Sequence, residues 1–178
     1  TAGRAGFGYA DDDDETVLED MLNKYTAVYI RKEFEITNST DLSRLALAIN
    51  YDDGFVLYLN GRYIFSINVT NEEGTITVSN HEASGIEYFP LAAFADALNK
   101  GKNVIGIEGH NATIDSSDFS LDPHLVVGGG YTNFIKRNSS DKLYDIRGKF
   151  SEEKGVEGDN EGGLSLIHIS EPTRLQDI

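Results

Sequence analysis

The chain of 178 residues carries 15 basic and 30 acidic side chains and has a formal net charge of −15 at pH 7. This charge opposes binding to nucleic acid and to anionic membrane surfaces, because both would repel the protein. The sequence contains no cysteine, which excludes disulfides, thiolate metal sites and cysteine nucleophiles. No apolar run approaches the roughly 18 residues of a membrane span, so membrane insertion is not expected.

Residues 1–26 are predicted to form a loop and a short helix that pack on the main domain. The opening stretch TAGRAGFGYADDDDE is glycine-rich and then acidic, a composition typical of loops. The next stretch, TVLEDMLNKY, predicts a helix in which Thr16 is the N-cap and Glu19 completes a capping box.

Residues 27–130 are predicted to form the core of a β-sandwich. The stretches AVYIRKEFEI and LALAINY alternate apolar and polar or small residues, as half-buried strands do. FVLYL and RYIFSINV flank Asn60-Gly61, a dipeptide that favours the type I′ turn of a β-hairpin. GTITV, NVIGIEG and FSLDPHLVV predict further strands, and PLAAFADALNKGKN predicts a connecting helix. We therefore expect an all-β fold, a two-sheet antiparallel β-sandwich with one or two short connecting helices.

The C-terminal part of the sequence differs from the core in composition. Residues 131–163 are rich in Glu, Gly, Asp and Lys and predict an acidic linker or the edge of a further domain, with a short strand in KLYDIRGKF as the alternative. Residues 164–174, LSLIHISEPTR, resemble the in-frame translation of a transposase adapter used in sequencing libraries. This resemblance implies that residues 164–178 are an artefact, that the source is metagenomic or whole-genome reads, and that the chain is a truncated fragment.

Residues 6–127 resemble the galactose-binding-domain-like jelly rolls that accompany secreted metallophosphoesterases, spore-coat-kinase-like proteins and lamin-tail proteins. The resemblance rests on GFGYADDDDETVL, VYIRKEFEI, INYDDGFVLYLNGR, NHEASGIEYF, KNVIGIEGHN and SSDFSLDPHL, with Ala10 where the family usually has glycine. It implies a jelly-roll sandwich in an extracellular or cell-surface protein. The implied role is a non-catalytic accessory module that binds carbohydrate or organises neighbouring domains of the same chain.

Two acidic stretches are candidates for calcium ligands. Asp52 and Asp53 in YDDG predict a turn, and Asp11 and Asp13 in ADDDDE predict a solvated loop. The alternative is a shared calcium site, because calcium prefers several carboxylate and carbonyl oxygens from converging loops. The family resemblance supports this alternative, since such sandwiches often hold a structural calcium. The Asp52-Asp53 pair is also similar to an aspartate pair in calcium-dependent, sugar-binding yeast adhesins.

Candidate carbohydrate-binding residues are Asn80, His81 and Glu82, which offer hydrogen-bonding groups on a turn-like loop, and the aromatic residues Tyr9 and Tyr88. The alternatives are local turn and capping bonds for the polar residues and core packing for the tyrosines.

Catalysis is not expected from this sequence. Asp52 and Asp53 are adjacent, so on a strand their side chains would point to opposite faces and could not flank one glycosidic bond. The stretch HEASG lacks the second histidine of a zinc-protease helix, and neither a Gly-x-Ser-x-Gly elbow nor a phosphate loop occurs. Two other functions remain open: a self-associating structural or adhesive unit of a fibre or surface layer, and a fragment of a secreted metallophosphoesterase or hydrolase whose catalytic domain is missing.

Overall fold

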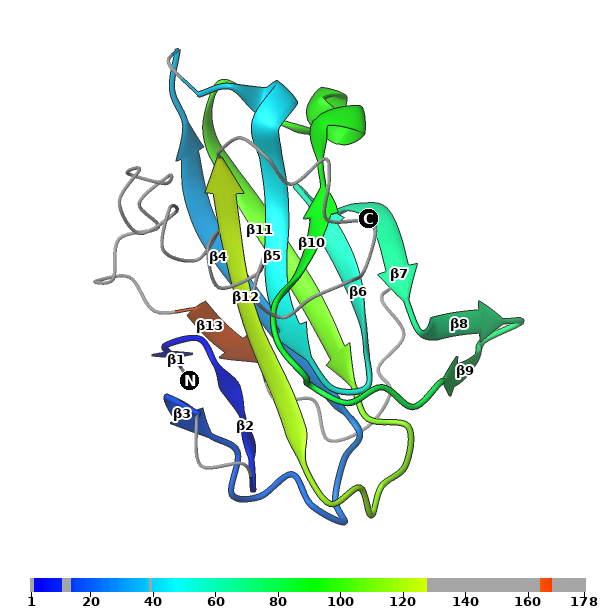
Figure 1. Ribbon diagram of the computed structural model, residues 1–178. Helices are drawn as coiled ribbons and strands as arrows, with labels where there is room; N and C mark the ends of the chain where they lie inside the picture. Colours follow the sequence, from blue (N-terminus) through cyan, green and yellow to red (C-terminus); the bar gives the residue numbers. More distant parts are fainter. Residues whose placement is uncertain (1, 11–13, 39, 128–163, 168–178) are drawn as a thin grey trace.

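A computed structural model, which describes residues 2–10, 14–38 and 40–127 and the backbone of residues 164–167, shows two facing β-sheets (Figure 1). The six-stranded sheet has the order β1 (Ala2–Gly3), β13 (Leu164–Ile167), β4 (Ala27–Ile36), β11 (Gly101–His110), β6 (Gly54–Leu59), β7 (Arg62–Ile67). The five-stranded sheet has the order β10 (Glu87–Pro90), β5 (Leu45–Tyr51), β12 (Phe119–Val127), β2 (Phe7–Tyr9), β3 (Thr16–Val17). All pairings within these two sheets are antiparallel except that of β2 with β3. The predicted all-β sandwich is therefore confirmed.

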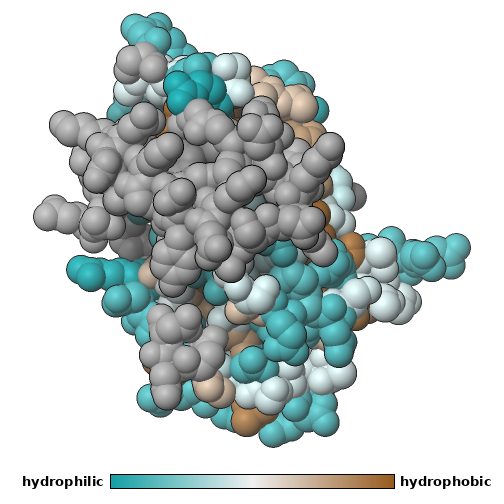
Figure 2. Space-filling model, viewed as in Figure 1, coloured by the Kyte–Doolittle hydropathy of each residue, from teal (hydrophilic) through white to brown (hydrophobic). Residues whose placement is uncertain are grey.

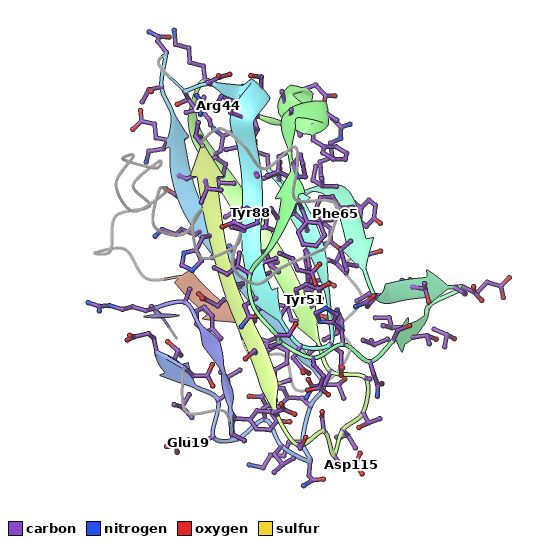
Figure 3. The ribbon with its side chains drawn as sticks, in the orientation of Figure 1. Glu19, Arg44, Tyr51, Phe65, Tyr88 and Asp115 are labelled. Carbon is purple, nitrogen blue, oxygen red and sulfur yellow. The ribbon has the colours of Figure 1, made fainter. Side chains whose placement is uncertain are left out.

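The core lies between the two sheets and is built by alternation along the strands. On β5, Leu45, Leu47, Ile49 and Tyr51 belong to the central cluster, whereas the alanines between them pack on the other side of the sheet. An aromatic group forms one part of the core, where neighbouring rings of Tyr51, Phe55, Phe65 and Phe89 have centroids 4.8 to 6.4 Å apart. The side chains of Tyr51 and Phe65 can be located in Figure 3.

The hairpin of β6 and β7 forms as predicted. Asn60 has a φ of 52° and Gly61 a φ of 79°, which are the left-handed conformations that a type I′ turn requires. The Asn60 side chain also joins this turn to the adjoining segments, because its Nδ2 donates to the Ala97 carbonyl at 2.8 Å and its Oδ1 accepts from the Val104 N–H at 2.8 Å.

A second hairpin, β8 (Val69–Glu72) with β9 (Thr75–Val78), projects from the body of the sandwich (Figure 1). The strand at GTITV is thus confirmed, and its partner β8 was not predicted. The tip of this hairpin is hydrophilic in Figure 2, in keeping with the exposed Glu72 and Glu73.

The helix predicted in TVLEDMLNKY is not formed. Thr16 and Leu18 instead donate their backbone N–H groups to the carbonyls of Gly6 and Gly8, which makes β3 a parallel edge strand beside β2. Turns follow, and Leu18 and Met21 are buried in the core. The apolar spacing of three that predicted a helix therefore arises from a turn that buries the same two side chains.

The helix predicted in PLAAFADALNKGKN is shorter than expected. The structure has a 3₁₀ helix at Ala92–Ala97, interrupted at Phe94, where φ is −111°. Pro90 ends strand β10 and does not open the helix, and Gly101, with a φ of 90°, begins strand β11. A second 3₁₀ helix, Leu42–Arg44, connects β4 to β5.

Strand β12 accommodates Pro123 because of its position in the sheet. Strand β2 pairs with β12 only from Phe119 to Leu121, so at Pro123 the strand has β5 as its single described neighbour. The nitrogen of Pro123, which has no hydrogen to donate, then points to the side of β12 where no described strand is paired, as is usual for proline in strands.

The acidic linker predicted for residues 131–163 lies outside the described residues. Within the adapter-like segment, residues 164–167 form β13, whose backbone pairs with β4 and β1. None of the helices in the described part of the chain has the length and apolarity that crossing a bilayer requires.

Candidate functional site

Three carboxylates from three different connections converge at one end of the sandwich. Asp52 lies between β5 and β6, Glu82 between β9 and β10, and Asp118 between β11 and β12. Their oxygens lie within 4.8 Å of one another. Asp115, in the same connection as Asp118, marks this end in Figure 3, and Arg44 marks the opposite end.

Asp53 fixes the two loops that bring Glu82 and Asp118 to this end. Its Oδ1 accepts the backbone N–H of His81 at 2.8 Å, and its Oδ2 accepts the backbone N–H of Ala112 at 2.7 Å. These are short, charge-assisted bonds to backbone donors of separate loops. Asp53 therefore acts as a clamp whose two oxygens tie both loops to the start of β6.

The residues on either side of the clamp hold it in position. The backbone N–H of Asp52 donates to Ser120 O at 2.9 Å, and that of Asp53 donates to His110 O at 3.1 Å. Gly54 must lack a side chain, because a Cβ there would lie 2.8 Å from Val69 Cγ2 and 2.9 Å from Ile67 O. In the Asp-Asp-Gly sequence, Asp52 thus supplies a carboxylate of the cluster, Asp53 clamps the two loops, and Gly54 allows the close approach of Ile67 and Val69.

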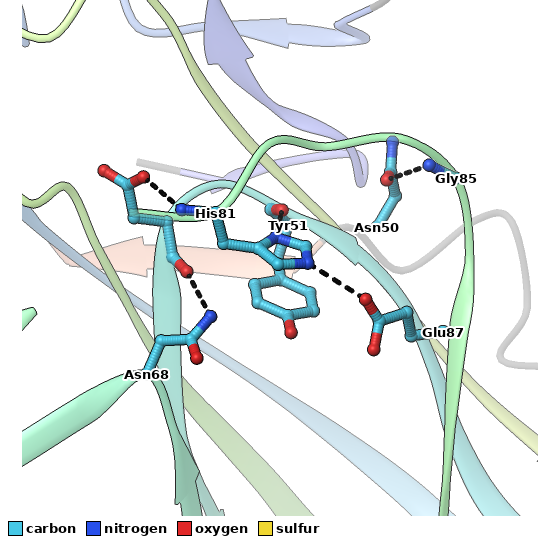
Figure 4. A network of polar contacts seen from close by, with 7 residues as sticks. Asn50, Tyr51, Asn68, His81, Gly85 and Glu87 are labelled. Atoms are coloured by element: carbon cyan, nitrogen blue, oxygen red, sulfur yellow. Dashed lines mark hydrogen bonds and ion pairs between the residues drawn. The ribbon is translucent and has the colours of Figure 1, made fainter. Parts of the chain in front are cut away.

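His81 anchors the loop between β9 and β10 a second time (Figure 4). Its ring stacks on Tyr51 with centroids 4.3 Å apart and planes 3° apart. Its Nδ1 lies 3.0 Å from Tyr51 O, and its Nε2 lies 2.9 Å from Glu87 Oε1. The loop is further held by the Gly85 N–H, which donates to Asn50 Oδ1 at 3.0 Å.

Asp52 has the most strongly perturbed carboxyl group of the site. Burial raises its pKa from 3.8 to about 7, and the charges of Asp53, Asp118 and Glu82 act in the same direction. One hydrogen bond, from the Ala83 backbone, opposes this shift. Because ionised Asp52 lies among other carboxylates in a buried position, a proton or a cation is needed to relieve the repulsion.

Asn111, which is bonded to the loop that carries Asp118, has a side-chain oxygen without a partner among the described residues. Its Nδ2 donates to the Asp118 carbonyl at 3.3 Å and to the Tyr9 hydroxyl at 3.1 Å. Its Oδ1 is buried and accepts no hydrogen bond from any described residue. An unsatisfied buried carbonyl is costly, so this amide points to a missing electropositive group.

This donor set fits calcium. Calcium binds six to eight oxygen atoms at about 2.3 to 2.6 Å, so oxygens within about 5 Å of each other can share one ion. Asp52, Glu82 and Asp118 offer carboxylate oxygens at this spacing, and Asn111 offers an amide oxygen. When bound, calcium would supply positive charge that offsets the repulsion among the carboxylates.

The residues predicted from the sequence fall into different environments. Asp52 and Glu82 lie in the carboxylate cluster, and Tyr9 lies beside it, with its hydroxyl donating to Ser116 O at 2.8 Å. Burial, followed by the charges of Asp118, Asp52 and Asp53, raises the pKa of Tyr9. Asp53 clamps the loops as described above.

The other predicted residues that the structure describes are not members of the carboxylate cluster. Tyr88 packs with Ala46, Ala48 and Ile86 on the outer side of the five-stranded sheet. Asn80 is exposed, and His81 is engaged with Tyr51 and Glu87. Asp11 and Asp13 lie outside the described residues. Asp118 and Asn111 were not predicted as site residues from the sequence.

Comparisons with known proteins add little to this geometry. No protein-family model matches the sequence, and no curated protein matches it. Among solved structures, a native α-L-rhamnosidase from Aspergillus terreus is similar, with 18% identity and a TM-score of 0.36 over 58% of this chain and 12% of that chain. A match at this score supports no inference about fold or function.

Loss of the clamp should destabilise the protein. An Asp53→Asn variant keeps one acceptor but places an amide group against the second backbone N–H, so we expect the free energy of unfolding to fall by about 2 to 4 kcal/mol. Urea denaturation measures this change. Asp41→Asn is the matched control, because the Asp41 carboxylate accepts local bonds from Ser43 at an exposed position. Equal losses in the two variants would contradict the clamp.

Stability without a cation should depend on pH through Asp52. Because its pKa is raised from 3.8 to about 7 in the folded state, the folded protein holds this proton more tightly than the unfolded chain does. The stabilisation is complete below about pH 4 and is lost as the pH rises through about 7. In chelator, the free energy of unfolding of the wild type relative to Asp52→Asn should therefore decline over this window. Parallel pH profiles of the two proteins would refute the assignment.

Proposed function

We propose that the chain is a non-catalytic, exported accessory module of the galactose-binding-like jelly-roll type. It binds carbohydrate and is stabilised by one calcium ion at Asp52, Glu82 and Asp118. The observation that carries the calcium assignment is the meeting of these three carboxylates from three separate loops. The unpartnered Oδ1 of Asn111 supports it, since the Nδ2 of the same amide donates to the Asp118 carbonyl. The motifs quoted above support the accessory role and the extracellular location, and the observed β-sandwich is compatible with both.

A catalytic use of the cluster is the main competing interpretation. A carboxyl group with a pKa near 7 beside ionised carboxylates has the electrostatics of a general acid. Asp52, however, is only 3% exposed, so a glycosidic oxygen could not reach it without movement of the loops. A small cation can be enclosed by the three loops, which favours the calcium-binding role.

Calcium should bind to this site and stabilise the fold. We expect one calcium ion per chain in isothermal titration calorimetry at pH 8. At a hundredfold excess over the dissociation constant, the ion should raise the free energy of unfolding by about 2.7 kcal/mol. Asp118→Asn and Asp52→Asn should each weaken binding at least tenfold, because each removes a charged ligand.

The control for this experiment is Glu72→Gln, which removes a carboxylate from the exposed hairpin β8–β9 and should bind calcium as the wild type does. Binding should also weaken below pH 7, since protons compete for Asp52. The absence of a calorimetric signal, together with an unchanged melting temperature in calcium and in chelator, would rule out the calcium assignment.

A further inference from the structure

The outer face of the six-stranded sheet carries tyrosines where a sandwich would normally present scattered polar residues. Tyr29 on β4, Tyr58 on β6 and Tyr63 on β7 share this face, because they alternate with core residues such as Ile30 and Leu57. Tyr63 is 56% exposed. This face is distinct from the carboxylate cluster, which lies in the loops at one end of the sandwich.

The strand register places four residues in one row across this face. Gly106 on β11 is opposite Arg31 on one side and Tyr58 on the other, and Tyr58 is opposite Tyr63. Adjacent strands are about 4.8 Å apart, so the row spans about 14 Å. Gly106 leaves a position without a side chain in the middle of the row, next to the Cβ of Tyr58.

The aromatic rings are held in fixed orientations. Tyr58 and Tyr63 have centroids 6.1 Å apart and planes at 77°, and Tyr29 makes a similar edge contact with His110 at 6.5 Å. Glu108 orients this group, because it accepts a hydrogen bond from Tyr58 and lies 3.4 Å from His110 Nε2. Burial and the charge of Glu108 raise the pKa values of both Tyr29 and Tyr58, so both phenols stay protonated.

We propose that this tyrosine face, formed by Tyr29, Tyr58 and Tyr63 around Gly106, binds a neutral polysaccharide chain. The inference rests on the proposed carbohydrate-binding function and assigns its binding surface. Aromatic faces stack on the apolar side of sugar rings, while phenol, guanidinium and carboxylate groups at the edges bond to hydroxyls. A row of this length suits an oligosaccharide segment better than a single ring.

The charges on this face select against an anionic ligand. Arg31 lies opposite Gly106, and the same face carries Glu33, Glu35 and Glu108 in a chain of net charge −15. An acidic polymer would therefore meet repulsion over most of the surface. A neutral, hydroxyl-rich chain meets none and can use these charged groups as hydrogen-bonding partners.

The test is affinity electrophoresis of the full chain in gels that contain galactomannan, arabinoxylan, hydroxyethylcellulose or polygalacturonate. We expect retardation by at least one of the three neutral polymers. Tyr63→Ala should weaken it at least about tenfold, since a stacked ring is lost. Gly106→Val should do the same by filling the open position. A Cβ at Gly106 lies 3.7 Å from the Tyr58 Cβ, an ordinary contact, so this variant should fold.

Ile76→Ala is the matched control, because Ile76 is also an exposed apolar residue but lies on the hairpin β8–β9. It should be retarded as the wild type is. Retardation that survives Tyr63→Ala and Gly106→Val but is lost in Asp52→Asn would place the sugar-binding site at the carboxylate cluster. That result overturns the tyrosine face and leaves the proposed function standing. Retardation by polygalacturonate alone would overturn the tyrosine face as a site for neutral chains and leave the carbohydrate-binding function standing, whereas retardation by none of the four polymers would overturn both.

Discussion

The loop end of this sandwich depends on the carboxylate of Asp53. Its two oxygens accept backbone N–H groups from separate loops, and those loops carry Glu82 and Asp118 toward Asp52. While Asp52 is protonated, the cluster contains one remaining carboxylate pair, Glu82 and Asp118, and two unit charges 4.8 Å apart repel each other by about 3.5 kcal/mol at an effective dielectric constant of 20. A pair of charge-assisted hydrogen bonds contributes a similar amount. The clamp can therefore hold the cluster together without a cation while Asp52 is protonated, and a cation would add stability once Asp52 is ionised.

Much of the fold could be predicted from the sequence, because alternation along a strand is a local signal of burial on one face. Strands β4, β5, β6, β7, β9, β11 and β12 all carry that signal. The wrongly predicted N-terminal helix falls where apolar residues are spaced by three. Leu18 and Met21 fit a helix equally well, but long-range backbone bonds to Gly6 and Gly8 make that segment a strand and a turn. No pattern in the local sequence predicts such a backbone pairing.

The site was predicted less completely. Asp52 was singled out because two aspartates precede a strand, but Asp118 was missed, since only the fold brings its loop beside Asp52. Asp53 was considered as a calcium ligand or a turn residue, and its bonds to His81 and Ala112 depend on loops distant in the sequence. A signal for Asp118 does exist, because an aspartate directly before a buried strand lies at the end of the sheet. Likewise, the tyrosine face could not be predicted without the strand register, which brings Tyr29, Tyr58 and Tyr63 onto one face.

The most direct test of this account is hydrogen exchange of the His81 and Ala112 backbone amides, measured by NMR in chelator. If Asp53 clamps both loops, these two amides should exchange slowly in the wild type and in Asp52→Asn, although they lie in loops, and both should exchange rapidly in Asp53→Ala, which removes both acceptor oxygens. Rapid exchange of both amides in the wild type, at the rate of exposed loop residues, would contradict the clamp. The convergence of Asp52, Glu82 and Asp118 would then lack its support.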